Sequence, residues 1–252
     1  MMGQEEQIRF CTRIADISFE VVCYHASTRQ LCRDYLIPDG TDCQETIRIT
    51  PEDLQQERQR MLKKADRYPE YLHASDASVE SMHLCRRIAE ILPKYDRILF
   101  HSSALAIDGQ AVLFTATSGT GKSTHARLWR EVFGDRVEMI NDDKPILHVT
   151  EDTAVVYGSP WRGKHGLGSN TCAPIKAVCQ ICRDSENKIT DLWSKEFFSV
   201  AMQQSYAPEN LDSMIRTVRA VSRLIKQTGT YRICCNMEPD AAKTAYDGIY
   251  FD

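Results

Sequence analysis

Residues 114–129 read FTATSGTGKSTHARLW, and the structure expected for this stretch decides how the rest of the chain is interpreted. The stretch begins within the apolar run AVLFTA, which is typical of a buried strand, and continues into a turn that contains glycines. The segment 122–133 then repeats apolar side chains at helical spacing, and Gly134 follows as a helix terminator. The pattern predicts a strand, a glycine loop and a helix in direct succession.

The turn in this stretch has the composition of a phosphate-binding loop, although Ala116 stands where the pattern G-x-x-x-x-G-K-[ST] has its first glycine. In such loops the backbone N–H groups face the phosphates, the lysine reaches the outer phosphates and the Ser or Thr hydroxyl ligates Mg²⁺. Because alanine is compatible with negative φ and Ala116 precedes the phosphate-binding amides, we expect nucleotide binding rather than an ordinary glycine turn. The residues predicted to bind the nucleotide are Ser118, Gly119, Thr120, Gly121, Lys122, Ser123 and Thr124.

Two adjacent acids, Asp142 and Asp143, follow the short run VEMIN. At the end of a strand, carboxylates can reach Mg²⁺ and the γ-phosphate of a bound nucleotide. A kinase needs a metal-bound acid and also a base that accepts the proton of the acceptor hydroxyl, and two acids offer both roles. We therefore predict Ser123, Asp142 and Asp143 as metal ligands and the two acids as catalytic residues. The alternative is a solvated turn between two strands.

The segment 158–170, GSPWRGKHGLGSN, interleaves glycines with basic side chains. Arg162 or Lys164 is predicted to stabilise the charge that spreads over the transferring phosphoryl oxygens, in a loop that acts as an active-site lid. The alternative is a plain surface loop. His101, which we place on the strand before the loop's own strand, is either a further catalytic residue or a hydrogen-bonded core histidine.

Taken together, LFHSSALAIDGQAVLFTATSGTGKST and the later INDDKPIL resemble the catalytic domain of HPr kinase/phosphorylase and its small bacterial relatives. These proteins share a fold with the ATP-dependent phosphoenolpyruvate carboxykinases. The resemblance covers the part of the chain from 95 to 185. It implies that one acid of the pair binds Mg²⁺ and the other accepts a proton, and that a histidine precedes the loop at an interval similar to that of His101, which makes its catalytic and core interpretations equally supported.

Other parts of the chain depart from that family. Residues 1–94 do not resemble the N-terminal domain of the full-length HPr kinases, and no segment matches the element of the family that docks HPr. The basic and metal-binding residues particular to the carboxykinases have no counterpart here. HPr itself is therefore not predicted as the acceptor, and carboxykinase activity is not predicted.

The expected function is an ATP-dependent, Mg²⁺-requiring phosphotransferase that acts on a hydroxyl of a protein, peptide or small molecule. One alternative, implied by the resemblance, is the reverse or hydrolytic reaction on a phosphoserine. Another is a nucleotide-binding regulatory module without turnover, in which ATP orders the loop 158–170 for a partner. Assembly into a homo-oligomer is compatible with the sequence.

Composition narrows the classes of protein to consider. A chain of 252 residues with 42% hydrophobic content can bury one sizeable core, with or without a small appendage. Its 31 basic and 35 acidic residues give a net charge of -4, which argues against a general nucleic-acid or membrane-surface binder. The first twenty residues are too charged for a secretory signal, and no long apolar run follows. A soluble, cytoplasmic protein is expected.

The sequence contains 10 cysteines, which in a cytoplasmic protein are expected to be reduced thiols. Cys179 and Cys182 are three residues apart in an expected strand, so they point to opposite faces and cannot share a zinc ion. We interpret both of them, and the neighbours Cys234 and Cys235, as buried core residues.

The predicted fold is α/β, with a mixed sheet and phosphate loop in residues 95–252 and a small α+β section in residues 1–94. Thr50 is expected to cap a helix that begins at Pro51. Expected helices elsewhere cover 27–35, 77–92 before Pro93, 122–133, 210–227 and a segment from about Pro239. An Asp-Gly turn at 108–109 is expected to join two adjacent strands, and VEMI, PILHV, AVVYG, PIKAVCQIC and YRICCN are further strand candidates.

Overall fold

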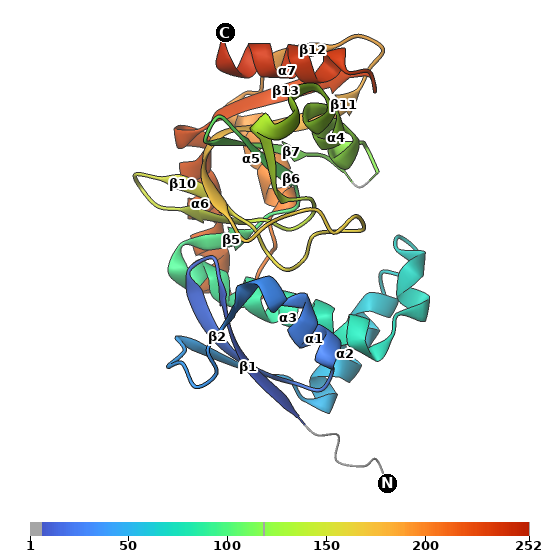
Figure 1. Cartoon of the computed structure of the whole chain (residues 1–252), viewed down its shortest axis with the longest axis vertical. Helices are drawn as coiled ribbons and strands as arrows, with labels where there is room; N and C mark the ends of the chain where they lie inside the picture. Colours follow the sequence, from blue (N-terminus) through green and yellow to red (C-terminus); the bar gives the residue numbers. More distant parts are fainter. Residues whose placement is uncertain (1–6, 118, 252) are drawn as a thin grey trace. The chain divides into compact units, whose positions relative to one another are not determined.

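A computed structural model of the chain describes residues 7–117 and 119–251. The contacts divide the chain into two compact units, one up to Ala89 and one from Glu90 onward (Figure 1). Sequence texture predicts the boundary between residues 94 and 95, at the start of the short apolar runs. Glu90 belongs to the second unit, where its carboxylate accepts a hydrogen bond from the Tyr206 hydroxyl at 2.8 Å.

The unit up to Ala89 combines short strands with helices. Its strands are β1 (Ile8–Ile14), β2 (Ile17–Cys23), β3 (Leu36–Ile37) and β4 (Glu45–Arg48), and its helices and helical turns are α1 (Ala26–Leu31), η1 (Arg33–Tyr35), α2 (Pro51–Leu62), η2 (Pro69–His73) and most of α3 (Asp76–Ile91). The strand order is β3-β1-β2-β4. Ala15 and Asp16, which join β1 to β2, both have positive φ, as the tight turn of a two-residue hairpin requires.

Helix starts in this unit follow the sequence closely. The backbone N–H of Asp53 donates to the Thr50 hydroxyl at 3.2 Å, and the N–H of Thr50 donates back to the Asp53 carboxylate at 2.9 Å. This reciprocal capping box, with Pro51 in the first turn, confirms the predicted start of α2. The helix predicted over 27–35 is instead two pieces, α1 and η1, separated at Cys32.

One buried carboxylate ties the helices of this unit to its sheet. Glu80 of α3 has no exposed surface, and it accepts hydrogen bonds from the backbone N–H groups of Tyr24 and His25 at 2.8 and 3.1 Å. The Thr28 hydroxyl in α1 donates to the same carboxylate at 2.5 Å. A buried charge that accepts several hydrogen bonds is stable where an unpaired one is not.

The unit from Glu90 onward contains a larger mixed sheet. Its strands are β5 (Arg97–Leu99), β6 (Ser103–Ile107), β7 (Gln110–Thr115), β8 (Val137–Asn141), β9 (Ile146–Val149), β10 (Ala154–Tyr157), β11 (Cys172–Arg183), β12 (Lys188–Asp191) and β13 (Gly229–Cys235). Its helices and helical turns are η3 (Leu92–Tyr95), α4 (Lys122–Phe133), η4 (Gly134–Arg136), α5 (Ser194–Gln204), α6 (Leu211–Gln227) and α7 (Asp240–Tyr250). Pro93 lies inside η3 rather than immediately after a helix end.

Helices cover both faces of this sheet. Leu113 and Val178 belong to one core, which includes residues of α5 and α6. Phe114 and Cys179, their neighbours along β7 and β11, belong to the other core, which includes residues of α4 and α7. Apolar residues therefore fill consecutive positions of the central strands, as expected of strands buried on both faces. Within the described ranges, no helix has both the length and the apolar character that a membrane span requires.

Strand direction places several strand ends at one edge of the sheet. The order runs β5-β9-β10-β11-β7-β6-β8, and β13 pairs with β11 beside this path. β6 is antiparallel to both β7 and β8, while β11 is parallel to both β7 and β13. The C-terminal ends of β7, β8, β11 and β13 and the start of β6 therefore lie along one edge, which we call the carboxyl edge. The predicted turn at Asp108 and Gly109 joins β6 to β7 at the opposite edge, and both residues have positive φ.

We predict that Thr50→Ala lowers the free energy of unfolding by about 1 kcal/mol, because the N–H of Asp53 loses its acceptor. Urea unfolding followed by far-UV circular dichroism measures the change. Thr50→Ser, which keeps the hydroxyl, should remain close to the native protein. An equal loss in both variants would show that the cap does not contribute.

Candidate functional site

The predicted phosphate loop connects β7 to α4 at the carboxyl edge. Gly119 and Gly121 have φ values of 80° and 129°, which L side chains rarely adopt, so glycine is required by the backbone at both positions. α4 begins at Lys122 and ends before Gly134, as the sequence predicts. Ser118, a predicted phosphate ligand, lies outside the described residues. Ser123 and Thr124 follow in the first turn of α4, where both are half-buried.

Lys122 turns back into the loop. Its ammonium donates to the carbonyl of Ala116 at 3.3 Å, and only 8% of the residue is exposed. Burial lowers the pKa of Lys122, while the charges of Asp143 and Asp142 act in the opposite direction. The structure thus brings the loop lysine and the acid pair into one electrostatic environment. Ala116, at 2% exposure, is part of the core beneath the loop and does not form part of the loop surface.

The two acids lie immediately after β8 but in different surroundings. Asp142 is 6% exposed and accepts a hydrogen bond from the Ser103 hydroxyl, at the start of β6, at 2.6 Å. The Asp143 side chain is 23% exposed and pairs with the ammonium of Lys144. The solvated turn considered from the sequence therefore does not describe Asp142. One carboxylate is held in the protein interior and its neighbour faces cations.

Buried Asn141 shapes the turn that carries the acids. Its side-chain oxygen accepts the backbone N–H groups of Asp143 and Lys144 at 2.8 and 2.7 Å. Its amide nitrogen donates to the carbonyl and the hydroxyl of Ser159 at 3.1 and 3.2 Å. Asn141 thus fixes the backbone of the acid pair and ties it to the start of the glycine-rich loop 158–170.

His101 lies in the connection between β5 and β6, so its predicted position on a strand is wrong. The chain leaves the sheet there because the N–H group of His101 bonds to the carbonyl of Gln204, at the end of α5, rather than to a neighbouring strand. The ring Nδ1 and the Gln204 side-chain oxygen are 3.0 Å apart, and Nε2 lies 3.5 Å from an Asp143 oxygen. His101 is therefore half-exposed beside the acid pair, and is not an enclosed core histidine.

The pKa of His101 is lowered. Burial is the largest cause and the charge of Lys122 adds to it, while Asp143 and the Gln204 hydrogen bond act in the opposite direction. At neutral pH the ring is uncharged, so one nitrogen donates and the other accepts. A neutral imidazole beside a carboxylate can accept or relay a proton.

The loop 158–170 folds over the end of β8. A Cβ on Gly163 would come within 3.1 Å of the Asp143 Cβ, and one on Gly168 would come within 2.8 Å of the Ile140 carbonyl. The glycines therefore let the loop backbone approach the acids closely. Arg162 is half-buried and packs against Gly168. Lys164 is exposed, and among the described residues no contact joins it to the acids, so its predicted catalytic role has no support from the geometry.

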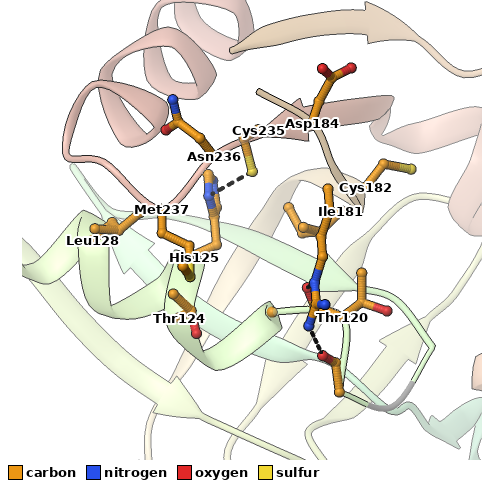
Figure 2. A pocket seen from close by; sticks show the side chains of 13 residues that line it. Thr120, Thr124, His125, Leu128, Ile181, Cys182, Asp184, Cys235, Asn236 and Met237 are labelled. Atoms are coloured by element: carbon orange, nitrogen blue, oxygen red, sulfur yellow. Dashed lines mark hydrogen bonds between the residues drawn. The ribbon is translucent and has the colours of Figure 1, made fainter. Parts of the chain in front are cut away.

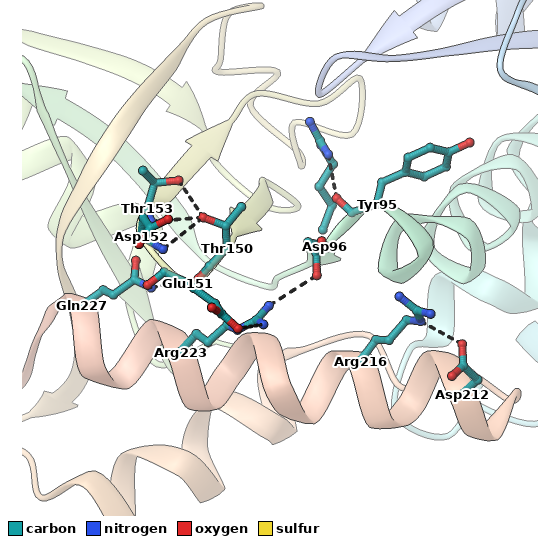
Figure 3. A network of polar contacts seen from close by, with 11 residues as sticks. Tyr95, Asp96, Thr150, Glu151, Asp152, Thr153, Asp212, Arg216, Arg223 and Gln227 are labelled. Carbon is teal, nitrogen blue, oxygen red and sulfur yellow. Dashed lines mark hydrogen bonds and ion pairs between the residues drawn. The ribbon is translucent and has the colours of Figure 1, made fainter.

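The hairpin that leads into this loop is anchored at its far end. Arg223 of α6 bonds to Asp96 at 3.4 Å and to Glu151, in the turn between β9 and β10, at 3.0 Å (Figure 3). The Gln227 amide donates to the backbone carbonyls of Thr150 and Glu151 at 2.9 and 3.0 Å. These contacts fix the strand β10 from which the loop 158–170 starts.

A pocket of about 440 Å³ lies on the other side of the phosphate loop, at the ends of β11 and β13 (Figure 2). The loop and the first turns of α4 form one wall, and the residues that follow the two strands form the other. Apolar side chains from Leu128, Ile181 and Met237 line it beside the polar Asp184 and Asn236. Its volume and mixed lining are typical of a small-molecule site.

Arg183, the last residue of β11, connects the pocket to the loop. Its guanidinium donates to the backbone carbonyls of Thr120 and Gly119 at 3.0 and 2.5 Å. These two carbonyls belong to the residues predicted to surround a phosphate. Arg183 therefore holds the shape of the loop from outside and leaves the loop's N–H groups unused by this contact.

His125 forms part of the pocket wall and is almost completely buried. The Trp129 indole donates to its Nε2 at 3.1 Å, so the proton of the neutral ring lies on Nδ1, 3.7 Å from the Cys235 sulfur. Burial lowers the pKa of His125 to about 4, so it carries no charge at neutral pH. We assign it a packing role in the wall of the pocket.

The cysteines divide differently from the prediction. Cys179 and Cys235 are buried in the core with α4 and α7, as expected. Cys182 and Cys234 are only half-buried, because they point to the opposite face near the ends of their strands. Their interpretation as buried core residues is therefore wrong.

The residues present fit a nucleotide with Mg²⁺. The described residues contain no cluster of three or more His, Cys, Asp or Glu side chains that could hold a metal by itself. Mg²⁺ at nucleotide sites is usually held by one or two carboxylates together with the phosphates, so Asp142, Asp143 and the Ser123 hydroxyl are a sufficient set. The buried ammonium of Lys122 and the glycine backbone at Gly119 and Gly121 match an anionic ligand.

Several residues of this site were not identified from the sequence. Ser103 precedes its partner Asp142 by 39 positions, and Gln204 follows its partner His101 by 103 positions. Arg183 reaches the loop across 63 positions. No short-range pattern marks any of these side chains. Lys144 directly follows the acid pair in the sequence, and its ion pair with Asp143 places it in the site.

Comparisons with known proteins give little. Neither a protein-family model nor a curated protein matches the chain. Among solved structures, the chain is similar to the structure of the Hpr(Ser) kinase/phosphatase from Coxiella burnetii, at 12% identity over 50% of this chain and 90% of that one, with a TM-score of 0.27. A similarity this weak supports no conclusion about activity.

We predict that the His101 ring titrates below its ordinary pKa near 6.5, in a proton NMR titration with the resonance identified by His101→Gln. Lys122→Met should raise the midpoint, because a nearby cation is removed, and Asp143→Asn should lower it. The unfolded chain then binds the proton first, so the stability due to His101 is present above about pH 6.5 and declines as the pH falls. The exposed control Lys243→Ala should leave the midpoint unchanged, whereas equal shifts in all three variants would contradict the site geometry.

Proposed function

We propose that the chain is an ATP-dependent, Mg²⁺-requiring phosphotransferase that acts on a hydroxyl group. The observation that carries the proposal is the position of Lys122. This buried lysine opens a helix directly after a glycine loop, and the nearby charges of Asp142 and Asp143 influence its pKa. A phosphate-binding element and a pair of acids thus meet at one edge of the sheet, which is where open α/β sheets bind ligands.

In this proposal the loop and Lys122 hold the phosphates. The backbone of Gly119 and Gly121 adopts the left-handed conformations of an anion-binding loop, and the N-terminus of α4 adds a partial positive charge. The ammonium of Lys122 exchanges its bond to the Ala116 carbonyl for one to a phosphate oxygen. Because the exchange occurs in a buried site, the attraction between ammonium and phosphate is stronger than in water.

The acid pair supplies the remaining chemistry. Asp142 or Asp143 accepts the proton of the acceptor hydroxyl, and the other carboxylate with the Ser123 hydroxyl holds Mg²⁺. The bound ion neutralises phosphate charge during transfer. His101 lies beside Asp143 and is uncharged, so it does not compete with the metal for the carboxylate as a cation would. Arg162, half-buried next to the end of β8, is the candidate cation for the transferring group.

The pocket between α4 and the ends of β11 and β13 is the proposed site of the nucleoside. It lies directly beside the loop but away from β8, so a nucleotide whose base occupies it directs its terminal phosphate toward the acids. Leu128, Ile181 and Met237 offer apolar contact to a base. Asp184 and Asn236 offer groups that can bond to a ribose or to base edges.

We predict that Lys122→Ala abolishes binding of ATP with Mg²⁺ in isothermal titration calorimetry, because the loop loses the ammonium group that is proposed to bind the phosphates. Lys243→Ala, the same substitution at an exposed position of α7, should bind as the native protein does. Native affinity in Lys122→Ala would exclude every nucleotide-based function for this loop.

The variant Asp142→Asn with Asp143→Asn separates catalysis from binding. It should bind ATP within about tenfold of the native protein but lose transfer of label from γ-labelled ATP to acceptors in a lysate of its own cell, because base and metal ligand are both removed. Glu238→Gln, an exposed acid outside the site, is the control and should keep transfer. ATP binding without any transfer by the native protein would instead indicate a regulatory module.

A further inference from the structure

Two half-buried thiols stand side by side at the carboxyl edge. β11 and β13 are parallel neighbours, and their register pairs Cys182 directly with Cys234. Ile181 on β11 and Ile233 on β13 belong to the core with α4 and α7, so the cysteines that follow them point to the other face of the sheet. The two thiols therefore share a face of the sheet.

The spacing of the strands is compatible with a bond between these sulfurs. Adjacent strands lie about 4.8 Å apart, which is within the Cα separation that disulfides require. The Cβ atoms of a disulfide are closer, at about 3.5 to 4.5 Å. Oxidation would therefore draw the two Cβ atoms together by a fraction of an ångström to about 1 Å and turn the strand ends accordingly, without bringing the Cα atoms closer.

Cations lie beside the pair. Lys188 pairs with Cys234 in the β12 register, and the guanidinium of Arg232 interacts with both thiols. For Cys182, burial and its contact with Cys234 raise the pKa, although Arg232 acts in the opposite direction. Cys234 has Lys188 as a direct cross-strand neighbour, and Cys182, on the far side of β13, does not.

We propose that Cys182 and Cys234 form a reversible disulfide that controls the phosphate loop. The oxidant is a low-molecular-weight disulfide. The Cys234 thiolate attacks one of its sulfurs, which forms a mixed disulfide and expels one small thiolate. The Cys182 sulfur then attacks Cys234, which breaks the mixed disulfide and expels the second small thiolate, and the Cys182 proton goes to that leaving group. Two protein thiols are oxidised and one small disulfide is reduced to two thiols.

Arg183 links the cysteine pair to the loop. Arg183 follows it directly and donates to the carbonyls of Gly119 and Thr120. A turn of the β11 end that brings the Cβ of Cys182 toward β13 shifts Arg183 relative to these carbonyls, because the loop itself follows β7 on the other side of β11. Oxidation should therefore loosen the loop. The consequence for nucleotide binding rests on the proposed function, whereas the disulfide and the loosening do not.

The test uses the whole chain, treated with glutathione disulfide and mapped by peptide mass spectrometry. The native protein should yield a Cys182–Cys234 disulfide that dithiothreitol reverses. Cys182→Ser should stop at a glutathione adduct on Cys234, and Cys234→Ser should form neither species at the pair. Cys172→Ser, which removes an exposed thiol elsewhere, is the matched control and should still form the disulfide.

Two readouts follow in the oxidised native protein. Amide hydrogen exchange at residues 119–122 should become faster, and ATP affinity should fall by about tenfold, as expected when hydrogen bonds that shape the loop are lost. Neither change should occur in Cys234→Ser.

Failure is recognisable at each level. Glutathione on Cys172 without a Cys182–Cys234 bond would overturn the proposal, and a disulfide with unchanged exchange would overturn the link to the loop. If the reduced protein binds no ATP, the proposed function fails. Amide hydrogen exchange at residues 119–122 still tests whether the disulfide loosens the loop.

Discussion

The parallel pairing of β7 with β11 is the interaction on which the candidate site depends. It places the end of β11 at the same edge as the loop that follows β7, so that Arg183 reaches the backbone of Gly119 and Thr120. Had the two strands been antiparallel, Arg183 and the pocket residues near it would lie at the opposite edge. The antiparallel β6 then carries the same edge across to β8 and its acids.

The acid pair shows how one short turn creates two environments. Asp142 points into the protein, where the Ser103 hydroxyl satisfies it, and Asp143 points toward Lys144 and His101. A buried carboxylate that has a hydrogen-bond donor keeps a fixed position, whereas a more exposed one can exchange partners. Asn141 supports this division, because its side-chain oxygen holds the backbone N–H groups of Asp143 and Lys144.

The features that can be predicted from the sequence are those determined by local interactions. The bounds 122–133 follow from glycines on either side of an apolar stripe, and the turn at 108–109 follows from residues that tolerate positive φ. Prediction failed where the partners are distant in the sequence. Gln204, at the end of α5, and Arg183, at the end of β11, are ordinary polar residues in the sequence, and only the tertiary fold brings them to His101 and the loop. The same limit applies to Cys182 and Cys234, which are paired by the register of two strands distant in the sequence.

The position of β6 between β7 and β8 has a consequence for what the site can hold. Each strand spacing is about 4.8 Å, so the loop and the acids are attached to strand ends about 9.5 Å apart. The strand spacing therefore sets the minimum length of a ligand that contacts both ends. A ligand that engages both ends would have to extend across the width of a strand, and a compact anion at the loop would not reach the acids. A ligand shorter than this spacing would therefore contact one of the two ends and not both.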